Sequence, residues 1–161
     1  MKDSIFKTYG VFIITFALTF YTLGAGIIDN YVIYRTFPVV GENEFVAFRA
    51  AFTPRIVAFL VVPLILRYIF SFLLLWLRPS AIRAWHVWLF IFFQTVAWIS
   101  TIAVQLPIQF ELDKGKSAEL IEKLLDSIWL RTSMTVACAA IMLWMMFLVI
   151  RSLTNEKSDI V

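Results

Sequence analysis

The chain has 161 residues, of which 61% are hydrophobic and 16% charged, and its formal net charge is +3. This composition excludes an ordinary soluble domain, in which about half of the residues are apolar and a quarter are charged. Because a membrane-spanning helix needs about 20 apolar residues, four spans would use most of the chain. The sequence predicts one all-α domain, residues 1–161, that forms a polytopic membrane four-helix bundle with amphipathic segments on its outer side.

The predicted spans are residues 9–28, 55–77, 87–106 and 129–150. The first carries four polar residues at spacings that place them on one helical face, which we expect to look inward: Thr15, Thr19, Thr22 and Asp29. Threonine hydroxyls can instead bond to their own helix backbone, so a local role stays open. Gly24 and Gly26 are expected to end this span near Asp29 or to allow close helix approach.

Residues 30–54 mix aromatic and charged side chains. Pro38 and Gly41 indicate a turn. Beyond it, Phe45, Phe48 and Phe52 recur at helical spacing, which is typical of an amphipathic segment lying in the membrane interface.

The second span contains Arg67 near its midpoint. An arginine there costs about 2.5–3.5 kcal/mol on insertion scales, so it must find partners. Pro63, four residues earlier, frees a backbone carbonyl that an arginine or a neighbouring helix could use. Two interpretations remain open: a structural arginine clamped by carbonyls and hydroxyls, or a cation that lines a polar cavity.

The third span follows a short basic turn at 78–83. His86 lies at the membrane edge just before this span, between Trp85 and Trp88, and is interpreted as interfacial. Polar and aromatic residues then follow at spacings of four, three, four and four: Gln94, Trp98, Thr101, Gln105 and Gln109. This stripe should face the bundle interior, either as hydrogen-bonding contacts between helices or as the wall of a cavity.

A polar turn follows Pro107, and Ser117 can cap a new helix. No helix breaker occurs between 117 and 150, which predicts one helix of about 50 Å. Its common face carries Arg131, Thr135 and Cys138. Three methionines farther along are interpreted as core residues rather than metal ligands: Met142, Met145 and Met146.

His86 and Cys138 are the only residues of their kinds, so neither a histidine cluster, a cysteine cluster nor an intrachain disulfide is expected. We predict no metal site and no cofactor. The basic residues sit at span ends, which favours a role in topology over nucleic-acid binding. Lys and Arg divide six to six between the two sides, and the short, acid-free turn at 78–83 favours cytoplasmic termini.

The sequence resembles small four-span bacterial membrane proteins of uncharacterised function, loosely the anthrone-oxygenase-like group. The resemblance covers nearly the whole chain in order and rests on residues 34–41, Phe45, 47–49, 55–56, 78–79, Trp98, 100–101, 105–107, Leu112, Gly115 and 129–132. It implies a multi-pass protein of the bacterial inner membrane, with Arg55, Gln105, Trp129 and Arg131 as pocket or structural residues.

The chain also departs from that family pattern. Histidines are expected where Arg49, Phe52 and Gln109 stand, and an acidic residue is expected near Arg67. If the family residues form a metal-binding or polar centre, this chain has arginines and an amide in its place.

Two functions compete. The first is binding or transformation of a lipophilic small molecule, with an enolate or phenolate held by cationic and amide groups. Asp29 and Glu111 are placed at span ends, so no general base is evident. The candidate ligand-binding residues are Arg49, Arg67, Gln94, Trp98, Gln105, Gln109, Trp129 and Arg131.

The second function is a non-enzymatic accessory or scaffold subunit of a membrane complex. In that case the polar residues serve helix packing, and the outer segments contact a membrane-protein partner or a second copy of the chain. Transport is a weaker third hypothesis, because no inverted repeat is evident.

Overall fold

A computed structural model describes residues 2–158, with side chains from Lys7 to Asn155. Over this part of the chain the structure consists of helices joined by short turns. They form four long rods: α1 (Lys2–Ile28), η1 (Asp29–Ile33) and η2 (Tyr34–Val39); α2 (Glu42–Ile56), η3 (Val57–Val61) and α3 (Val62–Trp76); α4 (Ala84–Ser100), η4 (Thr101–Gln105) and α5 (Leu106–Leu112); and α6 (Ala118–Ser158).

Each rod contains a helical stretch that is long and apolar enough to cross a membrane: Lys7–Val39, Glu42–Trp76, Ala84–Leu112 and Ala118–Asn155. The chain is thus a multi-pass membrane protein with an all-α four-helix bundle, as its composition predicts. Large side chains such as Phe59 and Ile99 stay exposed on the outside of the bundle, where lipid would cover them.

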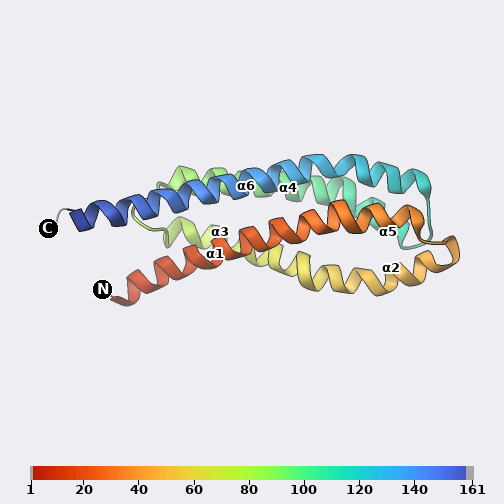
Figure 1. The fold of residues 1–161 in the computed structure, drawn as a ribbon, viewed down its shortest axis with the longest axis horizontal. Coiled ribbons are helices and arrows are strands. Elements are labelled where there is room, and N and C mark those ends of the chain that lie inside the picture. Colours follow the sequence, from red (N-terminus) through yellow and green to blue (C-terminus); the bar gives the residue numbers. More distant parts are fainter. Residues whose placement is uncertain (1, 159–161) are drawn as a thin grey trace.

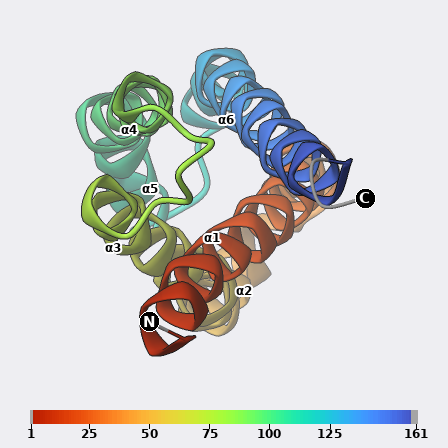
Figure 2. The ribbon, with the colours of Figure 1, turned by 90° about the vertical axis from the view of Figure 1, so that its left-hand side faces the viewer.

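The rods run up and down. Both ends of the chain and the turn at 77–83 lie at one end of the bundle, which we call the termini end, and the turns at 40–41 and 113–117 lie at the far end (Figure 1). Rods that are consecutive in sequence pack together, and α6 packs against α1, which closes the ring. Figure 2 shows this ring from the termini end.

The turn predicted at Pro38 and Gly41 is present between η2 and α2, but the segment at 30–54 extends two of the rods and does not lie across them. The aromatic repeat is helical, but α2 runs without a turn into η3 and α3 along the bundle axis, and η1 and η2 extend α1 (Figure 1). The first helix does not end at Gly24 or Gly26, since α1 runs to Ile28 and continues into η1. Neither glycine allows another helix to approach closely, because a Cβ at either position would meet nothing within 4 Å. Each rod is therefore longer than the span expected from its apolar run.

Two of the rods contain a widened π-helical turn directly before a proline. The Val62 N–H donates to the Val57 carbonyl just before Pro63, and the Leu106 N–H donates to the Thr101 carbonyl just before Pro107. A proline ring clashes with the carbonyl four residues earlier, and a wider turn relieves that clash. The carbonyl of Phe59, left free by Pro63, accepts a 2.8 Å hydrogen bond from the Tyr21 hydroxyl of α1.

Two hydrophobic cores lie at the two ends of the bundle. The core toward the termini joins α1, α3, α4, α6 and the turn at 77–83 through Phe12, Leu74, Ile82, Val87, Phe90, Ile91, Cys138, Met142, Met145 and Val149. The core at the far end joins η2, α2, α5 and α6 through Tyr34, Phe37, Phe45, Ile108, Leu112, Ile121, Leu124 and Ile128. The predicted packing role of Met142 and Met145 is confirmed.

The far end is also held by polar contacts between turns. The Ser117 hydroxyl caps α6 by accepting a bond of 3.3 Å from the Leu120 N–H, as predicted. The Lys116 ammonium donates to the carbonyls of Pro38 and Val40, at 2.8 and 2.5 Å. This lysine therefore connects the two turns that close the far end of the bundle.

Candidate functional site

A cavity of about 260 Å³ lies between the rods, and all four rods contribute to its wall. Most of the wall is apolar, including Leu60, Leu64 and Phe110. Of the eight residues that the sequence nominates, seven line this one cavity: Arg49, Arg67, Gln94, Trp98, Gln105, Gln109 and Arg131. Trp129 does not line it and is 67% exposed on α6.

Arg67 lies toward the termini end of the cavity and is only 1% exposed. Its Nε donates to Oε1 of Gln94 at 2.9 Å, and its Nη1 donates to the Thr22 hydroxyl at 2.8 Å. The guanidinium thus links α3 to both α4 and α1. The arginine is held by a hydroxyl and an amide, as a structural arginine would be, and it also lines the cavity, as a ligand-facing cation would.

The amide of Gln94 is held from both sides. Its Nε2 donates to the Ser71 hydroxyl at 2.7 Å, and that hydroxyl donates to the Arg67 carbonyl at 2.6 Å. The Thr22 hydroxyl likewise donates to the Leu18 carbonyl at 2.7 Å while it accepts from Arg67. This threonine therefore both bonds to its own helix and faces inward. The ring of contacts fixes the orientation of the guanidinium.

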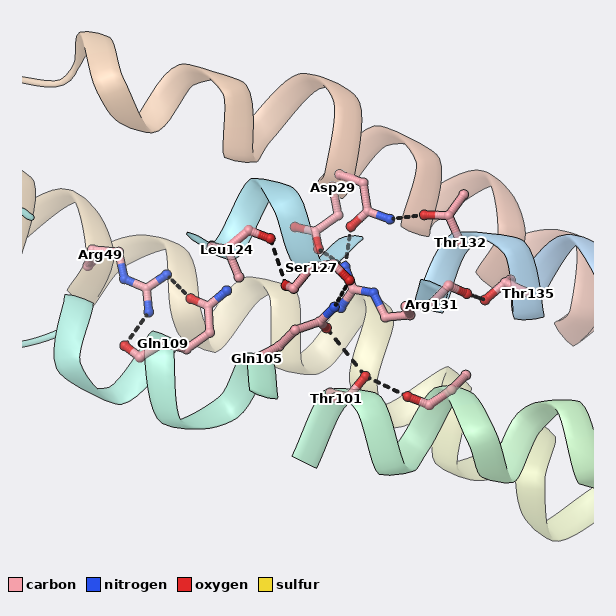
Figure 3. A network of polar contacts seen from close by, with 12 residues as sticks. Asp29, Arg49, Thr101, Gln105, Gln109, Leu124, Ser127, Arg131, Thr132 and Thr135 are labelled. Carbon is pink, nitrogen blue, oxygen red and sulfur yellow. Dashed lines mark hydrogen bonds and ion pairs between the residues drawn. The ribbon is translucent and has the colours of Figure 1, made fainter. Parts of the chain in front are cut away.

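Arg49 closes the far end of the cavity and is 2% exposed. Its Nε donates to Oδ1 of Asp113 at 2.8 Å. Its Nη1 donates to Oε1 of Gln109 at 2.5 Å (Figure 3). Its Nη2 bonds the Gln109 carbonyl at 3.1 Å, and its Cζ lies 5.5 Å from the centre of the Phe37 ring. A single side chain of α2 thereby forms hydrogen bonds with residues at the end of α5 and just beyond it.

Asp29 and Arg131 meet in the cavity wall, from η1 and α6 (Figure 3). An Arg131 Nη2 lies 3.6 Å from Asp29 Oδ2, and the same nitrogen donates to Oδ1 of Asn30. The Asn30 amide in turn donates to the Thr132 hydroxyl at 3.0 Å. Asp29 is 1% exposed, and neither of its carboxylate oxygens has a hydrogen-bond partner among the described residues.

The charges that line the cavity do not balance. Arg49 is paired with Asp113, and Arg131 is paired with Asp29. Arg67 has no carboxylate partner among the described residues. Three arginines and two aspartates line the cavity, which leaves a surplus of one positive charge at Arg67.

The predicted stripe on the third span does face the bundle interior. Gln94 and Gln105 are buried, and Gln105 Oε1 accepts from the Thr101 hydroxyl at 3.4 Å. Its Nε2 donates to the Ser127 carbonyl of α6 at 3.5 Å (Figure 3). The residues of the stripe form hydrogen bonds to other helices and also line the cavity, so the structure contains a feature of each of the two interpretations.

Sequence reasoning missed Asp29 as a cavity residue. A span that ends at Gly24 and Gly26 places Asp29 at its end. In the structure the helical rod continues and the carboxylate is enclosed. The signal was present, since Asp29 follows Thr22 by seven residues on the face expected to look inward. Asn30 and Tyr34 were missed for the same reason.

No protein-family model, curated protein or solved structure matches the chain. Arg49, Phe52 and Gln109 all line the cavity, and Arg49 and Gln109 are hydrogen-bonded to each other.

His86 lies apart from the cavity. It is buried at the start of α4, where its ring stacks on Trp85 at 3.8 Å and accepts a bond of 3.3 Å from the Trp144 indole. Within residues 7–155, no group of three or more His, Cys, Asp or Glu side chains is arranged to hold a metal ion. The polar groups of the cavity are mainly guanidinium, amide and hydroxyl groups, which suit hydrogen bonding to oxygen atoms.

Proposed function

We propose that the protein binds a lipophilic small molecule in the cavity between its spans and holds an anionic oxygen of that molecule at Arg67. The observation that carries the proposal is the surplus positive charge of a fully buried guanidinium in the cavity wall. Burying a charge without a counter-ion is costly, and a bound anion would remove much of that cost.

The hydrogen bonds of Arg67 support the proposal. Its Nε and Nη1 are used by Gln94 and Thr22, whereas its Nη2 forms no hydrogen bond with a described residue. A guanidinium has five N–H donors in a fixed plane, so donors remain for a ligand oxygen. The contacts to Gln94 and Thr22 hold the group in one orientation before any ligand arrives, which lowers the entropic cost of binding.

The remaining wall indicates the body of the ligand. Aliphatic side chains from three rods and the rings of Phe52, Trp98 and Phe110 surround the polar groups. Such a wall favours an apolar ligand body, and a few polar groups then set its orientation. An enolate or phenolate, the form that an anthrone-like substrate would take, belongs to this class. Catalytic transformation is the enzymatic version of the same proposal.

Copurification tests this proposal. Wild-type protein, Arg67→Leu and Arg55→Leu are purified in lipid nanodiscs, and the organic extract of each is compared by mass spectrometry. Arg55 is exposed on the same rod and outside the cavity, so its substitution makes the same chemical change elsewhere. We expect a lipophilic acid in the wild type and in Arg55→Leu, and its loss from folded Arg67→Leu. Identical extracts from all three proteins would contradict the proposal.

A non-enzymatic accessory subunit is the second candidate. One observation favours it. The contacts of Arg67 with Gln94 and Thr22 join three helices, and helix packing is a sufficient reason for such contacts without any ligand. Under this alternative Arg67→Leu loses yield or folding, and no small molecule copurifies with the wild type. A membrane-protein partner or a second copy of the chain would then be found by cross-linking in native membranes.

We also propose that the protein resides in the bacterial inner membrane with both termini in the cytoplasm. The two termini and the basic turn at 77–83 share one end of the bundle, which supports this orientation. The far end would then face the periplasm.

A further inference from the structure

We infer that Asp29 is a second anchoring point in the cavity and that it accepts a hydrogen bond from a hydroxyl or amine of the ligand. This inference rests on the proposed function and adds the chemical class of the ligand: a lipophile with an anionic oxygen at one end and a hydrogen-bond donor at the other.

The first support is the hydrogen bonding of the Asp29 carboxylate. Buried polar atoms almost always have hydrogen-bond partners, yet both oxygens of Asp29 lack one among the described residues. Two neighbouring groups do not fill this role. The Arg131 Nη2 lies 3.6 Å away and donates to Asn30 instead. The Tyr34 hydroxyl of the same wall lies near the carboxylate but forms no hydrogen bond of ordinary geometry with it. An ionised carboxylate can accept about four hydrogen bonds, so a donor inside the cavity has free acceptor positions.

A second unpartnered group lies in the same wall. The Thr53 hydroxyl, which comes from α2, is also buried without a hydrogen-bond partner among the described residues. Two such groups from two rods, both lining one cavity, indicate a polar ligand group rather than a local packing fault.

The spacing along the first rod, from Thr22 in α1 to Asp29 in η1, sets the length of the ligand. Asp29 follows Thr22 by seven residues, which is about 10 Å along a helix. Because Thr22 is bonded to Arg67, the anionic and donor groups of the ligand should lie about this far apart. Between them the same rod lines the cavity with Leu23, Gly26 and Ile27, none of which has a polar side chain.

Space is available along this path. A Cβ added at Gly26 would meet nothing within 4 Å, and Gly26 itself lines the cavity midway between the two anchoring points. An extended eight-carbon chain with an oxygen-bearing group at each end therefore matches the distance between the two anchors, because each C–C bond of about 1.5 Å advances such a chain by a little less than its own length.

The test uses two matched probes, 8-hydroxyoctanoate and octanoate. Binding to protein in nanodiscs is measured by equilibrium dialysis, with empty nanodiscs as the baseline. We expect the wild type to bind the hydroxy acid about tenfold more tightly, because a hydrogen bond to a charged group is lost with octanoate. Asp29→Asn should reduce this preference to near unity, whereas Asp126→Asn, an exposed change on α6, should keep it.

The outcomes separate the two proposals. Equal affinity of the wild type for both acids, or an unchanged preference in folded Asp29→Asn, would overturn the inference at Asp29 while leaving Arg67-dependent binding intact. Failure of both acids to bind in a manner that depends on Arg67 would overturn the proposed function as well. If Asp29→Asn does not fold, Asp29→Glu is used instead. Its carboxylate reaches one methylene farther into the cavity, so the preferred ligand should become the shorter 7-hydroxyheptanoate. An unchanged preference for 8-hydroxyoctanoate would count against the inference.

Discussion

Arg67 and Gln94 form a hydrogen bond of 2.9 Å between two membrane-spanning helices, and both side chains are almost fully buried. Replacing Gln94 with leucine leaves the Arg67 Nε without an acceptor in a region that excludes water. We expect Gln94→Leu to lower the free energy of unfolding by about 2 kcal/mol, the usual value for losing a partner of a buried charged group.

Reversible unfolding in mixed micelles measures this loss. Phe92→Leu, on the exposed face of the same helix, is the control and should change the free energy of unfolding by less than about 0.5 kcal/mol. Equal stability of the Gln94→Leu variant and the wild type would show that Arg67 does not depend on this amide.

The contact between Arg49 and Asp113 should be energetically coupled. Arg49 is buried and binds both Asp113 and Gln109, so its orientation is already restrained. A double-mutant cycle with Arg49→Gln and Asp113→Asn should give a coupling of about 1 kcal/mol or more.

The exposed pair Lys114–Glu111 lies one turn away and is the matched control, since it has a similar length of 2.6 Å but lies in solvent. Its coupling in the same assay should stay below about 0.5 kcal/mol. Indistinguishable couplings for the two pairs would refute a special role of Arg49 at the far end.

Tyr21 and Pro63 should act as a unit. The Tyr21 hydroxyl occupies the Phe59 carbonyl that Pro63 leaves free. We expect Tyr21→Phe to cost about 0.6–1 kcal/mol in the wild type, the range found for hydrogen bonds between membrane helices. In a Pro63→Ala background the cost should fall, because residue 63 regains an N–H that can bond to this carbonyl. Equal costs in both backgrounds would argue against the link.

Sided labelling tests the proposed orientation. Cysteines introduced at Ser80 and Glu42 are exposed at opposite ends of the bundle, and the native Cys138 is buried and should stay unlabelled. A membrane-impermeant maleimide should label Glu42→Cys in intact spheroplasts and label Ser80→Cys only after lysis. The reverse pattern would place the termini in the periplasm.

The sequence alone was sufficient to predict membrane-spanning helices and the inward faces of two of them. Apolar run length decides whether a segment can cross a bilayer, and helical periodicity decides which side chains share a face. Thr22, Gln94 and Gln105 are buried for this reason. Ser117 was likewise recognisable as a helix cap, because capping depends on only a few neighbouring residues.

Local signals located the turns between the rods, but they did not show that a rod continues through a glycine or a proline. Glycine and proline end helices in water, but in a membrane bundle neighbouring groups can satisfy the freed backbone, as Tyr21 does for Phe59. The first rod therefore continues through Gly24 and Gly26, and the second rod continues through Pro63. Asp29 was consequently placed at the end of a span, although it lies in the cavity wall.

The pairing within the cavity was decided by the tertiary structure. Arg49 meets Gln109 across 60 residues of sequence, and Asp29 meets Arg131 from the first and last rods. Each pair depends on how far one helix is shifted along another and how it is rotated, and periodicity within a single helix carries no information on either quantity. The sequence could thus indicate which polar residues face the interior. Helix packing alone determined that Arg67 lacks a carboxylate partner among the described residues. It also determined that the two oxygens of Asp29 lack a hydrogen-bond donor among them.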